Sequence, residues 1–501
     1  MSNLPSMFTA CVKEALFYSH RVATAAWRDE MQGVARSQRV ILLDKRHNAA
    51  HGGINQYFLK DLTMSKITLF FALFCFTQLA LALPVQHWQL PNGAQVYFIE
   101  DHDLPMIDVS VDFPAGSAYD PTGQDGLASL TQRLLDQGAG KLSDVQIAST
   151  LADTGAQLGG HFDADRAGLT LRSLSEPKQE QTSLNIFASL LAQPSFDPAV
   201  TDREKARVVD ALKTADGEPQ TLAAVAFQRA IFGQHPYAHR ESGEIATVSK
   251  LTADDLRAFW RSHYNATHAI IALVGDMTRT QADQIANNLT IGLPDSRFAA
   301  NTAIPPVPAL TAASEKTIVF PSKQSQIFIG QPGVARGDPD YFALYTGNYV
   351  LGGGGFDSRL MNDVRQKHGL AYSVYSYFLP MREAGPFEIG LQTRTAATQQ
   401  ALAVAHQTVS DFMAKGVTAA ELTQAKNSII GGFPLRIDSN QKLLEYLAVI
   451  GFYQLPTDYL DTFTQHVAQV TQAQIHQAFV AHIQPSRMVT VIVGQPSAFQ
   501  P

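Results

Sequence analysis

Cysteine and charge are both scarce in this chain of 501 residues. Only two cysteines are present, Cys11 and Cys75, which excludes a disulfide-rich scaffold and a cysteine-based zinc module. Charged residues make up 17% of the sequence, and the net charge is −7 without a long run of either sign. This balance argues against a nucleic-acid binder that depends on a basic surface. Hydrophobic residues make up 45%, enough for sizeable cores, and the length predicts two to four domains.

Simple catalytic signatures are also missing. The sequence contains no G-x-S-x-G, no P-loop, no dinucleotide-binding glycine motif and no H-E-x-x-H. Two histidine pairs have the i, i+4 spacing of a helical metal site. One of them, His47 and His51, precedes the predicted signal peptide described below; the other, His235 and His239, flanks Pro236. Because proline disfavours a shared helical face, an ordinary loop is the better interpretation of the second pair.

A secretory signal peptide is predicted at residues 64–82. Met64 and Lys66 precede the apolar run 67–81, and the run ends in Ala-Leu-Ala. The run is too short for a convincing membrane span, although an uncleaved anchor is the alternative. We therefore expect export, into the periplasm if the source is Gram-negative, and no stable membrane span in the mature chain.

Residues 1–63 precede this signal, although signal peptides begin at the true N-terminus. We interpret residues 1–63 as an over-extended or unstructured start, with a genuine cytoplasmic extension as the alternative. Both cysteines lie within residues 1–82, so the exported chain contains none and needs no oxidative folding.

The remaining sequence contains an internal repeat. Residues 248–275 align without gaps with residues 467–494, and the constant offset of 219 is too long for a solenoid. Between the copies, residues 297–314 are rich in Pro, Ala and Thr and read as a stiff linker. The sequence therefore predicts two similar domains, at residues 83–296 and 315–497.

Each predicted domain mixes strands and helices. Capping boxes at Ser143-x-x-Gln146 and Thr418-x-x-Glu421 predict helix starts, and residues 396–414 have helical periodicity. Strands are predicted at residues 96–100, 107–113, 167–174, 373–378 and 387–391. Strands grouped before helices indicate an α+β fold with mainly antiparallel sheets.

Three segments carry a family resemblance. Residues 113–128 read FPAGSAYDPTGQDGLA, residues 351–360 read LGGGGFDSRL, and residues 364–375 read VRQKHGLAYSVY. Together they resemble the pitrilysin/insulinase family of zinc peptidases, especially its two-domain bacterial and mitochondrial-processing-type subunits. The resemblance covers residues 84–496 and implies that fold for both domains.

The catalytic motif of that family is degenerate here. In active members the helix after G-L-A carries H-x-x-E-H, whose histidines bind zinc and whose glutamate polarises the zinc-bound water. In this chain, Ser129 and Arg133 stand at the two histidine positions and Gln132 at the glutamate position. None of them can take the role that the motif requires. In active members a further glutamate, about 77 positions after the motif, completes the zinc site. Only Asp210, 77 positions after Arg133, keeps a carboxylate near that position. The resemblance thus implies that the chain neither binds the zinc nor cleaves alone.

The second half departs less from the family. Members carry an arginine and a tyrosine seven positions apart that contact the substrate carbonyl beside the zinc, and Arg365 and Tyr372 match this pair. A guanidinium and a phenol can both stabilise a developing oxyanion. The alternative is a surface salt bridge for Arg365 and a half-buried strand position for Tyr372.

A glycine run precedes this pair. Processing-type subunits use a glycine-rich loop to contact substrate, which implies the same role for Gly352, Gly353, Gly354 and Gly355. The alternative is that these glycines only close the preceding helix. An extended substrate would pair with a sheet edge.

The resemblance therefore implies a non-catalytic, substrate-binding subunit of a heterodimeric periplasmic zinc metallopeptidase. Its partner would be a chain of the same fold that bears H-x-x-E-H and holds the zinc, and the substrates would be peptides. One alternative is a non-enzymatic scaffold, like the core subunits of this family in respiratory complexes. The other is an active metallopeptidase with a relocated metal site at His235, His239 and Glu244.

Overall fold

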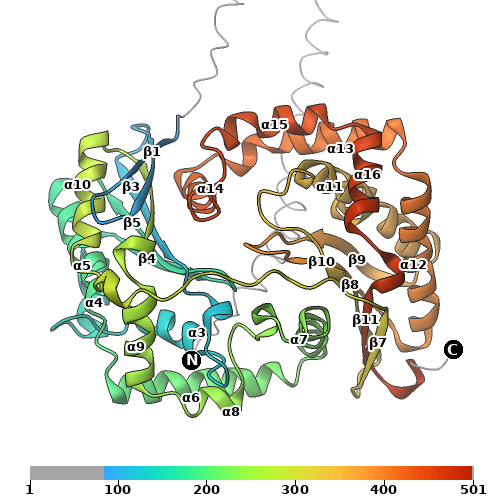
Figure 1. The fold of residues 1–501 in the computed structure, drawn as a ribbon, viewed down its shortest axis with the longest axis horizontal. Helices are drawn as coiled ribbons and strands as arrows, with labels where there is room; N and C mark the ends of the chain where they lie inside the picture. Colours follow the sequence, from blue (N-terminus) through green and yellow to red (C-terminus); the bar gives the residue numbers. More distant parts are fainter. Residues whose placement is uncertain (1–83, 499–501) are drawn as a thin grey trace, which may run out of the picture. The chain divides into compact units, whose positions relative to one another are not determined.

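The computed structural model describes residues 84–498, so the predicted signal peptide and residues 1–63 lie outside the described part (Figure 1). The fold is α+β, as the sequence predicts, with two sheets. The strand order of the first, six-stranded sheet is β1-β2-β6-β3-β5-β4. Its strands are β1 Gln86–Gln89, β2 Gln95–Glu100, β3 Met106–Phe113, β4 Gln157–Phe162, β5 Ala167–Leu174 and β6 Ile270–Gly275.

The second sheet has five strands in the order β7-β11-β8-β10-β9. One pair in each sheet is parallel, β2 with β6 and β7 with β11, and the other neighbours are antiparallel. The strands are β7 Ser314–Val319, β8 Gln324–Pro332, β9 Ala371–Phe378, β10 Pro386–Arg394 and β11 Val489–Gly494.

Helices cover these sheets. In the first half they are α3 Leu127–Leu134, α4 Asp144–Thr154, α5 Pro177–Ala192, α6 Pro198–Ala215, α7 Pro219–Phe232, α8 Ile245–Val248, α9 Ala253–His263 and α10 Arg279–Thr290. In the second half they are α11 Tyr341–Asn348, α12 Thr398–Lys415, α13 Ala419–Gly432, α14 Asn440–Phe452, α15 Tyr459–Gln469 and α16 Gln472–His482. Both predicted capping boxes form, at the starts of α4 and α13.

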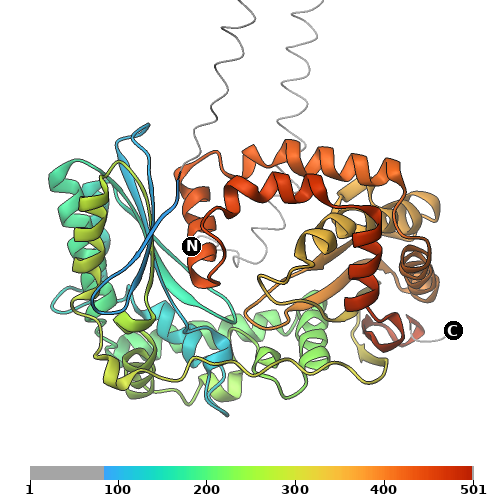
Figure 2. The same ribbon diagram turned by 45° about the horizontal axis from the view of Figure 1, so that its top comes forward.

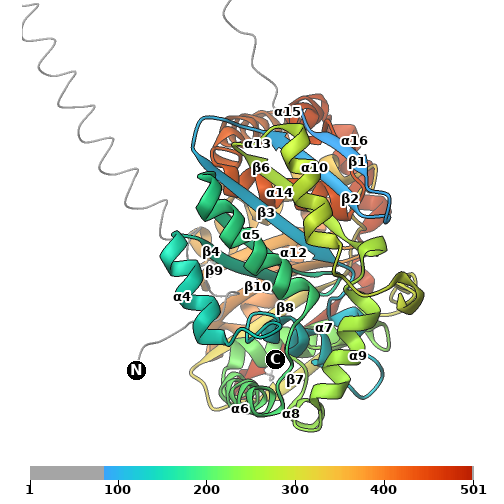
Figure 3. The same cartoon turned by 90° about the vertical axis from the view of Figure 1, so that its left-hand side faces the viewer.

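The side chains of β3 alternate between the two faces of the first sheet, which have different surroundings. Ile107, Val109 and Val111 are fully buried in the core on one face, which α5 and α10 help to cover (Figure 3). The intervening Asp108 and Asp112 point to the opposite face because successive side chains of a strand alternate. Polar side chains of β3 therefore lie on the second face, next to Ala272 and Val274 of β6, which pack in an apolar cluster with α14.

The repeat extends well beyond the segments that reveal it in the sequence. The starts of β2 and β7, β5 and β10, α9 and α16, and β6 and β11 are all 219 residues apart. The fold thus consists of two copies of one α+β unit.

One helix of each copy packs against the sheet of the other. Helix α7 packs against β8 and β11, while α14 packs against β6, β3 and β2 (Figure 1 and Figure 2). Phe227 of α7 stacks on Phe328 at 5.6 Å, and Leu447 of α14 is fully buried with the strands of the first sheet. Burial of one such side chain contributes about 1.5–3 kcal/mol. This exchange stabilises the two copies as one unit.

A buried carboxylate connects the copies at the β4–β5 turn. Asp165 accepts hydrogen bonds from the Tyr237 hydroxyl at 2.5 Å, the Tyr453 hydroxyl at 2.9 Å and the Arg382 backbone N–H at 2.7 Å. Asp165 is fully buried, and this burial raises its pKa. Tyr237, in the loop with the His235 and His239 pair, therefore has a structural role.

Candidate functional site

The helix that would carry the zinc motif forms as predicted, but its polar side chains do not form a metal site. Helix α3 buries Leu130 and Leu134 in the core, while Arg133 lies exposed and Ser129 is half-buried. The Gln132 amide donates to the Gly168 carbonyl oxygen at 3.4 Å. These side chains follow the amphipathic pattern of a helix on a sheet and offer no nitrogen or carboxylate ligand.

Asp210, the remnant carboxylate, is also unavailable as a buried ligand. It lies on α6, its side chain is 75% exposed, and it forms an ion pair with Lys213 at 3.0 Å. A catalytic zinc needs three protein ligands. Within residues 84–498, the side chains at the family's zinc positions do not gather into a group of metal-ligating residues. The described residues at these positions therefore do not fit the family's zinc.

The alternative metal site is not supported either. The two ring nitrogens of His235 contact the Pro305 carbonyl oxygen at 2.7 Å and the Tyr237 N–H at 3.1 Å. Glu244 pairs with Arg229, and His239 lies 3.3 Å from the Ser117 carbonyl oxygen. Each side chain therefore holds a different loop contact, and the three do not share a ligand set.

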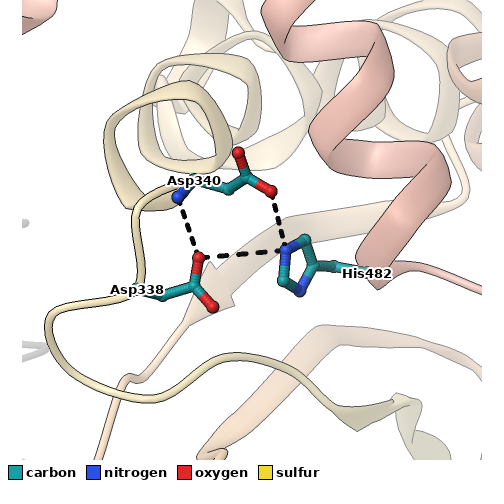
Figure 4. A group of neighbouring side chains, drawn as sticks. All are labelled: Asp338, Asp340 and His482. Atoms are coloured by element: carbon teal, nitrogen blue, oxygen red, sulfur yellow. Dashed lines mark hydrogen bonds and ion pairs between the residues drawn. The ribbon is translucent and has the colours of Figure 1, made fainter.

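One group of metal-ligating residues does occur elsewhere, and the sequence pattern did not reveal it. Asp338, Asp340 and His482 lie together where α11 begins and α16 ends (Figure 4). His482 Nε2 is 3.0 Å from Asp340 Oδ2, and Asp338 Oδ1 accepts the Asp340 N–H at 2.8 Å. These bonds connect the two helix ends and satisfy the polar groups without an ion.

Arg365 and Tyr372 lie together, as part of an aromatic stack. Arg365 is on the π-helix Met361–Lys367, and Tyr372 is the second residue of β9. The guanidinium carbon of Arg365 is 4.7 Å from the Tyr372 ring centre and 4.8 Å from the Phe356 ring centre. Tyr372 is 81% exposed and Phe356 is 58% exposed. The guanidinium is thus held between two aromatic rings at the surface.

The donor groups of this stack have no partner within the described part of the chain. Neither the Arg365 guanidinium nor the Tyr372 hydroxyl takes part in a hydrogen bond or ion pair among residues 84–498. The surface salt bridge considered as the alternative for Arg365 is therefore not seen. Phe356 was not identified from the sequence, although it directly follows the glycine run.

The glycine run brings a tight turn against β9. A Cβ on Gly352 would lie 2.2 Å from Ser376 Oγ and 2.5 Å from Ser376 N, and one on Gly354 would lie 2.5 Å from the Tyr349 carbonyl oxygen. Gly355 has φ +60°, which favours glycine. Close packing and backbone conformation thus account for these positions, and a substrate contact by Gly352–Gly355 remains a prediction.

The face of the first sheet that carries Asp108 and Asp112 holds a cluster of ionisable side chains that was not identified from the sequence. Asp112 is fully buried and lies 3.2 Å from Arg166 and 3.0 Å from His161 of the edge strand β4. Burial raises the pKa of Asp112 to about 6 and, with the nearby Arg166, lowers the pKa of His161 to about 3. Arg172 binds Asp108 through two hydrogen bonds of 2.8 and 3.1 Å. Strand β4 pairs with β5 alone among the described strands.

Comparison with known proteins identifies the family. The model of the insulinase family (peptidase family M16) matches residues 95–241, and the model of the peptidase M16 inactive domain matches residues 250–429. A crystal structure from Pseudomonas fluorescens, described as a peptidase M16 inactive domain, is 35% identical. The match covers 84% of this chain and 100% of the Pseudomonas fluorescens chain, with a TM-score of 0.80. This chain belongs to the M16 peptidase family. The resemblance inferred from the sequence is therefore confirmed.

Other M16 relatives include proteins with and without peptidase names. The "Non-peptidase homolog YmxG" of Helicobacter pylori is 26% identical over 402 residues, which are 80% of this chain and 91% of that protein. The "Uncharacterized zinc protease SCO5738" of Streptomyces coelicolor is 24% identical over 72% of this chain and 79% of its own length. No helix within residues 84–498 is long and apolar enough to cross a membrane.

Proposed function

We propose that this M16 chain is the non-catalytic, peptide-binding subunit of a heterodimeric zinc metallopeptidase. Its partner is a chain of the same fold that carries H-x-x-E-H and holds the zinc, and the complex acts on peptides in the periplasm. The degenerate positions on α3 support the absence of catalysis by this chain alone, as does its similarity to a protein named a non-peptidase homologue.

The observation that carries the proposal is the geometry of Arg365. The rings of Phe356 and Tyr372 lie near its guanidinium and restrain it. A guanidinium stacked on rings uses its faces, so its N–H groups at the edge stay available for a hydrogen-bond acceptor. The Tyr372 hydroxyl supplies a second donor. A stacked arginine with unpaired donors is suited to an oxyanion that forms on a substrate held by the partner.

Division of the site between two chains is chemically reasonable. Peptide hydrolysis needs a metal-bound nucleophile on one side of the scissile carbonyl and donors that stabilise the oxyanion on the other. The partner's metal supplies the activated water, while Arg365 and Tyr372 of this chain supply donors and orientation. Turnover then requires an interface that holds the partner's metal and the donor groups of this chain in fixed positions.

Strand β4 is the favoured place for the peptide backbone. Its outer edge pairs with no other strand of residues 84–498, and its burial pattern is that of a partly exposed strand. An extended peptide can add to such an edge through main-chain hydrogen bonds, largely independently of its sequence. At the edge of the second sheet, Gly352 packs closely against Ser376 of β9, and Asn348 donates to the Ser376 carbonyl oxygen at 2.8 Å.

Co-purification tests this proposal. The tagged chain is recovered from a periplasmic extract of its source, and proteins present at near one-to-one are identified by mass spectrometry. We expect an M16 chain with an intact H-x-x-E-H and peptidase activity in the recovered complex. Recovery of the chain alone, or with unrelated envelope proteins and no activity, would contradict the proposal and favour a scaffold.

A further inference from the structure

Glu388 is a carboxylate that has no partner in its surroundings. It lies on β10, opposite Tyr377 of β9 on one side and Gly330 of β8 on the other. The side chain is half-buried, yet its carboxylate takes part in no hydrogen bond or ion pair between residues 84 and 498. Its oxygens are not among the buried unpartnered atoms of the described residues, so water still reaches them, but a carboxylate partly removed from water gains from a cation or hydrogen-bond donors.

Aromatic residues flank Glu388 on the same face of the sheet. Tyr375 and Tyr377 lie on the same face of the sheet, with ring centres 5.1 Å apart. Tyr375 lies over Gly390, since a Cβ on this glycine would be 2.3 Å from the ring. On the other side, a Cβ on Gly330 would be 2.9 Å from Phe227 Cζ of α7. The two glycines thus make room for rings on both sides of Glu388.

These surroundings favour a positive charge. Burial raises the pKa of Glu388 to about 7, because neither an adjacent cation nor a donor stabilises its ionised form. Aromatic faces attract cations, and a carboxylate forms its strongest hydrogen bonds with guanidinium and ammonium groups. Tyr377 is 43% exposed, and Glu388 and Tyr375 are half-buried, so all three side chains are partly in contact with solvent.

We propose that Glu388, Tyr375 and Tyr377 form a subsite for the basic side chain of a bound peptide. An arginine or lysine of the peptide would pair with the carboxylate and lie against the tyrosine rings. This inference rests on the peptide-binding function proposed above and adds a preference for basic peptides.

The test compares two peptides that differ in charge and not in shape. One is an unstructured peptide with blocked ends and a single central arginine, and the other carries citrulline in its place. Binding of both to the protein is measured by fluorescence anisotropy at pH 8. We expect about tenfold tighter binding of the arginine peptide, the size of one charge-assisted hydrogen-bonded contact.

Variants of the protein then test which side chains cause the preference for the arginine peptide. Glu388→Gln, which keeps the shape of the side chain, should abolish the arginine preference and leave citrulline-peptide binding unchanged. Tyr377→Leu should reduce the preference by removing one ring, which gives a second variant should the first be misfolded. Glu315→Gln is the matched control, because Glu315 is an exposed residue on β7 of the same sheet and should retain the full preference.

The outcomes separate this inference from the function on which it rests. Equal binding of both peptides to the wild type, or an arginine preference that survives in Glu388→Gln, would overturn the basic subsite alone. Failure of both peptides to bind would overturn the peptide-binding function and the subsite with it.

Discussion

The guanidinium carbon of Arg365 lies 4.7 Å from the centre of the exposed Tyr372 ring, although the two residues are seven positions apart in sequence. Phe356 covers the guanidinium as well, at 4.8 Å. The pair expected from the family resemblance is therefore part of a three-residue stack. The third member comes directly after the glycine run, which places the glycine segment and the Arg/Tyr pair in one surface feature.

Phe356→Ala removes one of the rings near Arg365. Loss of a cation–π contact of about 0.5–1 kcal/mol should reduce turnover of the proposed two-chain peptidase about two- to fivefold, with stability unchanged. Phe298→Ala is the matched control, because Phe298 is also half-exposed and stacks with an exposed arginine, Arg261, at 4.9 Å. Steady-state kinetics of both variants check this. Equal effects of the two substitutions would contradict a special role for Phe356.

Gly352→Ala tests the packing explanation of the glycine run. The added Cβ would meet the Ser376 backbone nitrogen at 2.5 Å, and such overpacking should cost about 1–3 kcal/mol of unfolding free energy. In contrast, Gly431→Ala in α13 places its Cβ in open space and should stabilise by about 0.5–1 kcal/mol. Urea unfolding measures both. A stable Gly352→Ala protein would show that this glycine is not required by packing.

Glu388→Gln should change the pH dependence of stability. The folded-state pKa of Glu388 is raised to about 7, above that of an unfolded chain, so the folded state binds its proton more tightly. Its contribution to stability is present below about pH 4 and is lost as the pH rises through 7. The substitution should therefore stabilise the protein more at pH 8 than at pH 5. Thermal melts of both proteins at the two pH values test this, and an equal difference would show that Glu388 is solvated.

Metal analysis tests whether this chain lacks a zinc site. After purification without chelators and dialysis, we expect less than about 0.1 zinc per chain, because the degenerate positions lack the three ligands that zinc needs. Plasma mass spectrometry gives the content. Stoichiometric zinc would contradict the expectation. Loss of that zinc in His482→Gln would then assign it to the group with Asp338 and Asp340.

Much of the fold could be predicted from local signals in the sequence. Strand β5 has the predicted bounds, the helices capped by Ser143 and Thr418 start where expected, and the duplication at an offset of 219 recurs throughout. The edge strand β4 was missed, because its Gly159 and Gly160 weaken the alternating pattern. The exchange of α7 and α14 was missed as well, since an amphipathic helix does not specify which sheet it covers.

The candidate site was predictable only where a motif marks it. Arg365 and Tyr372 were found through the family resemblance, whereas Phe356 and the Asp112–His161–Arg166 network depend on contacts between distant segments. Glu388 has no sequence signal either. It is distinguished by the absence of a partner in its neighbourhood, which the sequence alone cannot show.

The most direct test of the central claim is the turnover of the proposed complex between this chain and an H-x-x-E-H partner, with Arg365→Ala or Tyr372→Phe in this chain. Arg261→Ala is the control, because Arg261 is also stacked on an aromatic ring, although it is more exposed than the half-buried Arg365. Loss of an oxyanion donor predicts that kcat falls about 10²- to 10³-fold for Arg365→Ala, and measurably for Tyr372→Phe, while the complex stays intact in gel filtration. Unchanged kcat in both variants, in an intact complex, would contradict the proposed contribution of this chain to catalysis.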